Sequence, residues 1–319
     1  MNVIDLMIQK ALRAGLRVSF KLPSGYPFPV HMLRRGMEFG ARLFKTRPET
    51  DIRPISLGGV PGKRIAPDGS PRKAMLHFHG GAFFTGSSKT HRAMGSEFAV
   101  RGKVNVYMPD YRRAPEHPYP AALDDGWAAY HALLEQGYQP HDIVLGGDSG
   151  GCALILSLAI RLRDRNLPLP AGLVMLSPFL DLTLNSASIE IYRRRDPMVS
   201  RYALLRGANA FRGAIAADDP RVSPLFADLH GLPTTLIQVG GDEILLDDAI
   251  RFATRARDAG MPVENQIHDG MWHNFQMFNR FVEPADRALD DIARFVRDVL
   301  NRQSHPIPEG RRSNYELLS

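Results

Sequence analysis

The sequence contains only one cysteine, Cys152, among its 319 residues. A single cysteine excludes an internal disulfide and a cysteine-rich metal site, and it fits a reducing compartment. The chain also lacks any run of about 18 apolar residues, the length that a membrane-spanning helix needs. Its first ten residues have neither the apolar run nor the small-residue cleavage site of a signal peptide. We therefore expect a cytoplasmic protein with no integral membrane association.

Strong charge of one sign is also missing. The 40 Lys and Arg residues exceed the 34 Asp and Glu residues by six. Basic residues are spread along the chain, and their densest clusters are only residues 193–195 and 311–312. No basic stripe, base-stacking motif or known nucleic-acid-binding fold accompanies them. We therefore expect a basic, soluble surface and no nucleic acid partner.

Short apolar runs alternate with longer helical patterns from about residue 50 onward. Strands are predicted at 74–78, 104–108, 143–145, 173–176, 235–239 and 263–267, and helices at 120–136, 150–165, 247–259 and 283–301. Strands that alternate with helices form parallel crossovers, so the fold class is α/β, with a mostly parallel central sheet covered by helices on both faces.

Two segments depart from this alternation. Residues 1–50 are helical in pattern, and residues 186–226 form a connection far longer than the usual two to six residues. Both are interpreted as parts of a cap. The predicted division is therefore 1–50 as N-terminal cap helices, 51–185 and 227–302 as the core, 186–226 as a cap insertion and 303–319 as a flexible tail.

The strongest local motif is Gly-Asp-Ser-Gly-Gly at residues 147–151, between a predicted strand and a buried helix. The pattern G-x-S-x-G at such a junction predicts a nucleophile elbow, in which a strained turn projects the serine above the sheet. We predict that Ser149 is the nucleophile and that Asp148, which points away from it, is structural. The alternative is an ordinary glycine turn with a buried serine.

A nucleophilic serine needs a histidine base. Three histidines follow the last crossovers: His268 directly after a strand, His305 in the polar tail, and His273 in the loop before the final helix. We predict that His273 is the base, because its loop is placed to reach over the sheet. His268 is interpreted as structural.

The base in turn needs a carboxylate, which in α/β hydrolases lies between the serine and the histidine in the chain. Asp242 is the first carboxylate after the strand at 235–239, and two glycines precede it. We predict Asp242 as the acid. Glu243 and Asp247 remain alternatives.

The developing oxyanion needs backbone N–H donors. Gly80, Gly81 and Ala82 follow the strand at 74–78, and Gly150 follows the nucleophile, so these four residues are the candidate oxyanion hole. Metal binding through His77 and His79 is the competing interpretation, but no further ligands complete a site.

Together these motifs resemble one family. The segment 79–82, the segment 111–118 (Tyr-Arg-Arg-Ala-Pro-Glu-His-Pro), the elbow, Asp242 and His273 are similar, in order, to the bacterial hormone-sensitive-lipase-like esterases. The resemblance covers about residues 73–300. It implies an α/β-hydrolase fold with a helical cap and ester hydrolysis without a cofactor. Ala82 stands where the family usually has glycine, and Gly150 where it usually has alanine.

Aromatic residues flank the oxyanion loop and the base. Phe83, Phe84 and Trp272 are predicted to line the substrate pocket, where apolar walls suit acyl esters. Further Met and aromatic residues fall in the expected cap, where ordinary packing is an equally good interpretation: Met32, Met37, Phe39, Met198, Tyr202, Leu205 and Phe211.

We therefore predict a serine carboxylesterase that hydrolyses short- to medium-chain esters through an acyl-enzyme, with no metal and no cofactor. A deacetylase, amidase or lactone hydrolase would use the same triad. A non-catalytic small-molecule receptor and a metal-dependent hydrolase are weaker alternatives. The expected partner is a small-molecule ester, and the oligomeric state, a homodimer included, stays open.

Overall fold

A computed structural model describes residues 3–69 and 71–302. The predicted flexible tail, 303–319, lies outside the described residues. The described chain forms one eight-stranded sheet with the order β1-β2-β4-β3-β5-β6-β7-β8, in which β1 and β4 pair antiparallel with β2 and all other pairs are parallel. The strands are β1 Thr50–Leu57, β2 Val60–Pro67, β3 Ala74–Phe78, β4 Asn105–Pro109, β5 Ile143–Asp148, β6 Gly172–Leu176, β7 Thr235–Gly240 and β8 Val263–His268. The predicted α/β class with a mostly parallel sheet is confirmed.

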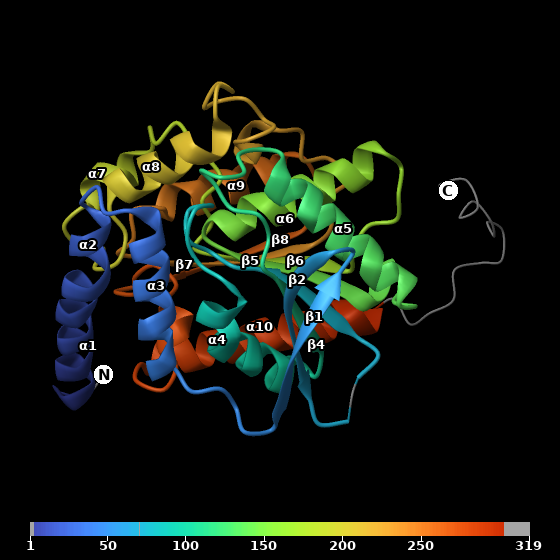
Figure 1. Ribbon diagram of the computed structural model, residues 1–319, viewed down its shortest axis with the longest axis horizontal. Helices are drawn as coiled ribbons and strands as arrows, with labels where there is room; N and C mark the ends of the chain where they lie inside the picture. The colour runs from blue at the N-terminus through green and yellow to red at the C-terminus, as the bar shows by residue number, and fades with distance from the viewer. Residues whose placement is uncertain (1–2, 70, 303–319) are drawn as a thin grey trace.

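Helices cover both faces of this sheet (Figure 1). One face carries α4 (Ser88–Gly102) and α10 (Glu283–Arg302), which pack against each other. The other carries α5 (Ala121–Glu135), α6 (Gly150–Asp164) and α9 (Leu246–Asp258). Because both faces are covered, every residue of β3, β4, β5, β6 and β7 is buried, as expected for central parallel strands.

The parallel strands end together at one edge of the sheet. In the strand register Phe78 lies beside Gly147, Asp148 beside Leu176, and Gly240 beside His268. The loops that leave these strands therefore meet, which is where open α/β sheets bind ligands.

A set of short helices, called the cap below, lies over this edge (Figure 1). The N-terminal part comprises α1 (Val3–Leu16), a π-helical turn (Arg17–Lys21), α2 (Leu22–Ser24), α3 (Val30–Gly40) and a 3₁₀ turn (Ala41–Leu43). The second part comprises α7 (Ala187–Ile191), α8 (Arg201–Arg212) and a 3₁₀ turn (Pro224–Phe226). Both segments that were expected to depart from the alternation are thus helical. None of the helices in the described ranges is long and apolar enough to cross a bilayer.

Sequence patterning missed the β1–β2 hairpin and α4. The hairpin turns at Gly58 and Gly59, both with positive φ, but β1 is largely exposed and contains Pro54, so it shows no apolar run. Helix α4 is mostly buried although many of its residues are polar, Ser88, Thr90, His91, Ser96 and Glu97 among them. A helix buried through polar contacts leaves no apolar stripe in the sequence.

Candidate active site

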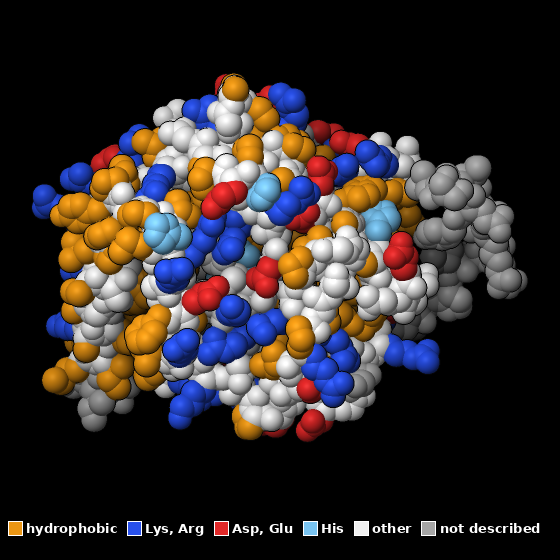
Figure 2. Space-filling view, viewed as in Figure 1, with side chains coloured by type: hydrophobic (Ala, Val, Ile, Leu, Met, Phe, Trp, Pro, Cys, Tyr) orange, Lys and Arg blue, Asp and Glu red, His pale blue; other side chains and the backbone are white. Residues whose placement is uncertain are grey.

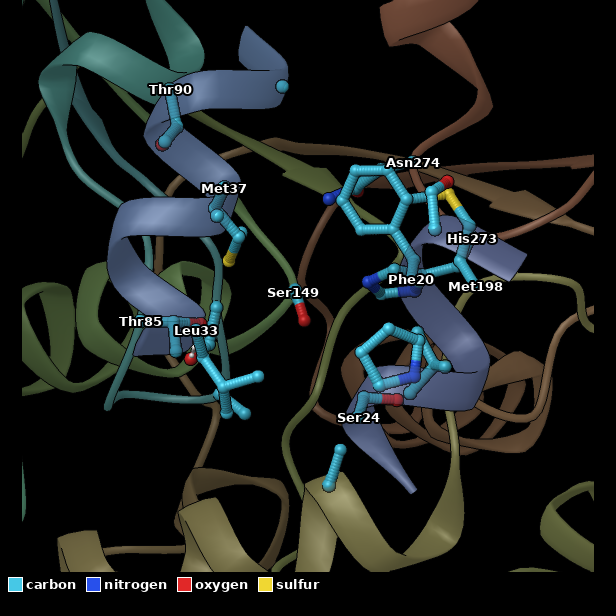
Figure 3. Close-up of a pocket in the computed structure, with 18 of the residues that line it drawn as sticks. Phe20, Ser24, Leu33, Met37, Thr85, Thr90, Ser149, Met198, His273 and Asn274 are labelled. Carbon is cyan, nitrogen blue, oxygen red and sulfur yellow. Dashed lines mark hydrogen bonds between the residues drawn. The ribbon is translucent and has the colours of Figure 1, made fainter. Parts of the chain in front are cut away.

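The turn between β5 and α6 places Ser149 at the edge of the sheet. Ser149 has φ 52° and ψ −122°, a strained conformation for a residue with a side chain. A Cβ on Gly147 would lie 2.7 Å from the Gly151 carbonyl, and one on Gly151 would overlap the Phe78 carbonyl. The two glycines therefore let the chain turn tightly enough to expose the hydroxyl. Ser149 lines a cavity of about 430 Å³, into which its side chain points (Figure 3).

His273 lies on the wall of the same cavity, in the loop between β8 and a 3₁₀ turn at Phe275–Phe278. Burial lowers the pKa of His273 below the ordinary value of histidine, so the neutral ring, which can accept a proton, is favoured. The structure thus brings the predicted nucleophile and base to one cavity. His268 instead packs against the ring of Phe275 outside the cavity, and His305 lies outside the described residues.

The predicted acid, Asp242, does not face the histidine in this structure. The carboxylate of Asp242 faces Arg13, at 2.9 Å, and Arg195, at 3.7 Å. It is Glu243 Oε2 that lies 3.8 Å from His273 Nδ1, and Glu243 is fully buried. Both carboxylates lie in the turn that follows β7, and there the first faces the cap and the second faces the histidine.

Ser177 connects Glu243 to the histidine loop, and sequence reasoning missed it. This residue directly follows β6 and has φ 47°. Its hydroxyl donates to Glu243 Oε2 at 2.8 Å and accepts the Asn274 N–H at 3.0 Å. Burial raises the pKa of Glu243, whereas the Ser177 hydroxyl bond acts in the opposite direction. The only sequence signal was its position at the end of a strand neighbouring β5.

The loop after β3 presents backbone N–H groups to the cavity. Gly81 (φ 117°) and Ala82 (φ 47°) both line it, and their amides donate to no acceptor within the described part of the chain. Thr85 holds the turn through its amide and hydroxyl, both 2.9 Å from the Gly81 oxygen. Gly80 does not line the cavity, and Gly150 begins α6. Gly81 and Ala82 are therefore the amides of this loop that a ligand can reach.

Helix α8 of the cap packs closely against the loop of Gly81 and Ala82. A Cβ added to Gly207 would overlap the Ala82 carbonyl and lie 2.7 Å from the Ala82 side chain. The glycine therefore permits a close approach that fixes the outer side of the loop. On the inner side Tyr111 donates to the His79 carbonyl at 2.8 Å.

Asp148, inside the elbow, is held by three side-chain hydrogen bonds. It accepts from His77 at 3.1 Å, His91 at 3.2 Å and Asn274 at 2.6 Å. Burial opposes its charge, but the two histidines outweigh burial and hold the pKa of Asp148 well below its usual range. The structural role expected for Asp148 fits these contacts, which also tie the elbow to the residue after His273.

The two histidines proposed as metal ligands have separate partners. His77 bonds to Asp148, whereas His79 Nδ1 lies 2.9 Å from the Gly80 carbonyl and its ring stacks on Tyr111. Burial lowers the pKa of His79 to about 3, so it is neutral. Within residues 3–69 and 71–302, no group of three or more His, Cys, Asp and Glu side chains could hold a metal ion.

Of the three aromatic residues predicted to line the pocket, only Phe84 does so. Phe83 and Trp272 are fully buried: Phe83 stacks on Phe211 at 4.0 Å, and Trp272 packs edge-on against Phe278. They support the pocket from behind because their side chains point into the core. The cap supplies most of the apolar wall, including Phe20, Phe28, Met32, Leu33, Met37, Phe44 and Met198; Phe39, Tyr202 and Leu205 are exposed outside it.

Three cations spaced four residues apart hold the two parts of the cap together. Arg13, Arg17 and Lys21 donate to the backbone carbonyls of four successive residues, 193–196. Arg13 also reaches the Gly270 carbonyl in the histidine loop at 3.0 Å. Asp196, at the end of this run, accepts the Ile244 N–H at 3.2 Å. The cap is thus connected to both loops that carry His273 and Glu243.

Comparison with known proteins shows the family and fold of the chain. The family model of the α/β-hydrolase fold matches residues 75–277. An esterase from Acinetobacter venetianus is 45% identical over 285 residues, which cover 89% of this chain and 94% of the relative. An acetyl-hydrolase from Streptomyces hygroscopicus is 35% identical over 250 residues, or 78% of this chain and 83% of the relative. A crystal structure of an esterase from the bacterial hormone-sensitive lipase family superposes with a TM-score of 0.87 at 34% identity, covering 94% of this chain and 99% of the other.

Proposed function

The chain belongs to the bacterial hormone-sensitive-lipase-like esterases and is a carboxylic ester hydrolase, and on that premise we propose that Ser149, His273 and Glu243 form its catalytic triad. One observation carries the proposal. Ser149, His273 and the amides of Gly81 and Ala82 border a single cavity, and Glu243 lies behind the histidine. Nucleophile, base and oxyanion donors therefore reach the same bound carbonyl group.

In the proposed reaction, Ser149 Oγ attacks the ester carbonyl while His273 takes its proton. The carbonyl oxygen becomes an oxyanion, stabilised by the N–H groups of Gly81 and Ala82 and by that of Gly150 at the start of α6. His273 then protonates the departing alkoxide. A water molecule, deprotonated by the same histidine, attacks the acyl-enzyme and releases the acid.

Glu243 stabilises the imidazolium that forms at His273. The 3.8 Å between Oε2 and Nδ1 exceeds hydrogen-bond length. Catalytic hydrogen bonds are often long before substrate binds and tighten in the complex. Asp242, paired with Arg13, instead connects the acid loop to the cap.

The substrate is a small ester with an apolar acyl group of short to medium length. The cavity of about 430 Å³ falls at the lower end of small-molecule sites, and its cap side is apolar. The name of the Streptomyces relative, acetyl-hydrolase, supports short acyl groups. Rates on p-nitrophenyl acetate, butyrate, octanoate and palmitate test this range: we expect the highest kcat/KM at butyrate or octanoate, and a maximum at palmitate would contradict it.

Amide and lactone hydrolysis by the same triad remains the second candidate, because only the leaving group differs. The acetyl-hydrolase relative is the observation that favours an acetyl ester or amide. Hydrolysis rates distinguish an esterase from an amidase when the acetyl ester of an aromatic alcohol is compared with the acetyl amide of the corresponding aromatic amine.

Enlarging Leu33 is expected to shorten the preferred acyl chain. Leu33 projects from α3 into the cavity (Figure 3), so Leu33→Trp fills space that a longer chain needs. The kcat/KM for octanoate relative to acetate should fall about tenfold or more. Leu205→Trp, on the exposed side of α8, is the matched control and should leave the ratio unchanged. An equal effect of both variants would remove Leu33 from the acyl site.

Ser177→Ala is expected to slow catalysis and shift its pH dependence. Loss of a hydrogen bond to a carboxylate costs about 1.5–3 kcal/mol, or roughly 10- to 100-fold in kcat. The rate falls at acidic pH when the Glu243–His273 pair takes up one proton, with an apparent pKa that belongs to the pair. Removing the hydroxyl disfavours the charged carboxylate, so this acid limb should move to higher pH.

The control is Ser96→Ala, which removes a buried hydroxyl in α4 away from the cavity. It should leave both kcat and the pH profile unchanged. A Ser177→Ala enzyme with a lower kcat but an unshifted acid limb would indicate a structural role for Ser177 only.

A further inference from the structure

The net charge, counted from both basic and acidic residues, is distributed unevenly between the first 50 residues and the rest of the chain. Residues 1–50 contain nine Lys and Arg but only three Asp and Glu, a net charge of +6. The other 269 residues contain 31 of each sign. The entire formal net charge of the protein therefore belongs to the N-terminal segment of the cap.

The same segment exposes most of the large apolar side chains on the surface. Among the described residues, 16 large hydrophobic side chains are exposed, and ten of these belong to residues 6–43. The extreme cases are Leu43 (83% exposed), Phe39 (71%), Val18 (67%) and Met7 (66%). Single exposed apolar residues are ordinary, but a cluster of this kind on a monomer marks an interaction site.

Apolar and basic side chains lie together on this surface, which we call the N-terminal face (the exposed side chains of residues 6–45). Figure 2 shows hydrophobic side chains gathered over α1–α3 with Lys and Arg beside them. The guanidinium of Arg42 lies 5.6 Å from the centre of the exposed Phe39 ring. Lys10, Arg35 and Lys45 are also exposed.

The N-terminal face is continuous with the mouth of the catalytic cavity. Phe28 and Met32 are 42% and 52% exposed, yet both also line the cavity. These two side chains thus belong both to the N-terminal face and to the wall of the cavity that holds Ser149.

We propose that the N-terminal face docks the protein on an anionic phospholipid surface, with the cavity mouth toward the lipid. Exposed apolar side chains with basic residues beside them on short helices are the chemistry of interfacial helices, which attach without spanning the bilayer. Each Lys or Arg near an anionic surface strengthens attachment about fivefold. A second copy of the chain fits less well, because two copies of this basic face would repel each other.

Co-sedimentation with vesicles tests the proposal on the full chain. We expect binding to vesicles of equal parts phosphatidylglycerol and phosphatidylcholine. Pure phosphatidylcholine, or a salt concentration of about 1 M that shortens the Debye length to ~3 Å, should weaken binding about tenfold or more. These arms use the unaltered protein and need no enzymatic activity.

Two double variants separate the charged and apolar contributions. Lys10→Glu with Arg42→Glu, and Phe39→Ser with Leu43→Ser, should each weaken binding to the anionic vesicles about tenfold or more. The control is Ile250→Ser with Ile267→Ser, which removes two exposed apolar side chains outside the cap, one on α9 and one on β8. It should leave vesicle binding unchanged. An unchanged thermal unfolding midpoint verifies that each variant is folded.

Three results would overturn the proposal. The first is equal binding to anionic and neutral vesicles. The second is unchanged vesicle binding in both N-terminal double variants. The third is a lipid-independent dimer that Phe39→Ser with Leu43→Ser dissociates, combined with no vesicle binding, which would assign the face to a second copy.

Discussion

Ser149→Ala is expected to lower kcat for a soluble ester by about 10⁵- to 10⁶-fold. The substitution removes the only hydroxyl that the elbow presents to the cavity, while His273 and the amides of Gly81 and Ala82 stay in place. The residual rate should come from oxyanion stabilisation and binding alone, and KM should change little. Steady-state kinetics on p-nitrophenyl butyrate measure both quantities. A variant that keeps more than a few per cent of the rate would place the nucleophile elsewhere.

Ser149→Gly provides a matched control for stability. Both variants lack the Ser149 hydroxyl, but glycine accepts φ 52° without strain, whereas alanine does not. A strained position of this kind costs about 1–3 kcal/mol, part of which the greater chain entropy of unfolded glycine offsets. Ser149→Gly should therefore unfold at a higher temperature than Ser149→Ala by the equivalent of about 1 kcal/mol.

The second large effect is expected at Glu243. Glu243→Gln keeps the size of the side chain but removes the charge that, in the proposed triad, stabilises the imidazolium of His273. We therefore expect kcat to fall about 10³- to 10⁴-fold. Asp242→Asn removes a partly exposed ion pair with Arg13, worth about 0.2–1 kcal/mol, so kcat should fall less than about tenfold.

Kinetics of the two variants side by side decide the assignment, because the residues are neighbours in the chain and the substitutions are chemically equivalent. A large loss in Asp242→Asn together with a small loss in Glu243→Gln would return the acid to Asp242. Equal large losses would mean that the loop must be intact as a unit.

The parts of the site that were predictable from sequence are those that local chain geometry determines. The elbow is encoded within five residues. Ser149 takes a positive φ between a strand and a helix, and the backbone packs so closely there that only glycine fits at positions 147 and 151. The central strands were recognisable because burial on both faces favours runs that are mostly apolar. The loop of His273 followed from its place between the last strand and the last helix.

The parts that were not predictable depend on side-chain direction and on distant partners. Asp242 and Glu243 differ only in which side of the chain they face, and the partner that decides this, Arg13, is 229 residues away from Asp242 in sequence. Phe83 and Trp272 flank functional residues but point into the core. Ser177 makes hydrogen bonds to Glu243 and Asn274, which lie far away in the chain, so no local sequence pattern predicts them.

The central claim is that Ser149 is an activated nucleophile, and a fluorophosphonate ester tests it most directly. The wild-type protein and Ser149→Ala are incubated with the reagent, and the modified peptide is located by mass spectrometry, with His273→Ala as a measure of activation. The account predicts one adduct on Ser149, absent from Ser149→Ala and formed far more slowly in His273→Ala. No adduct, or an adduct on another residue, would contradict it.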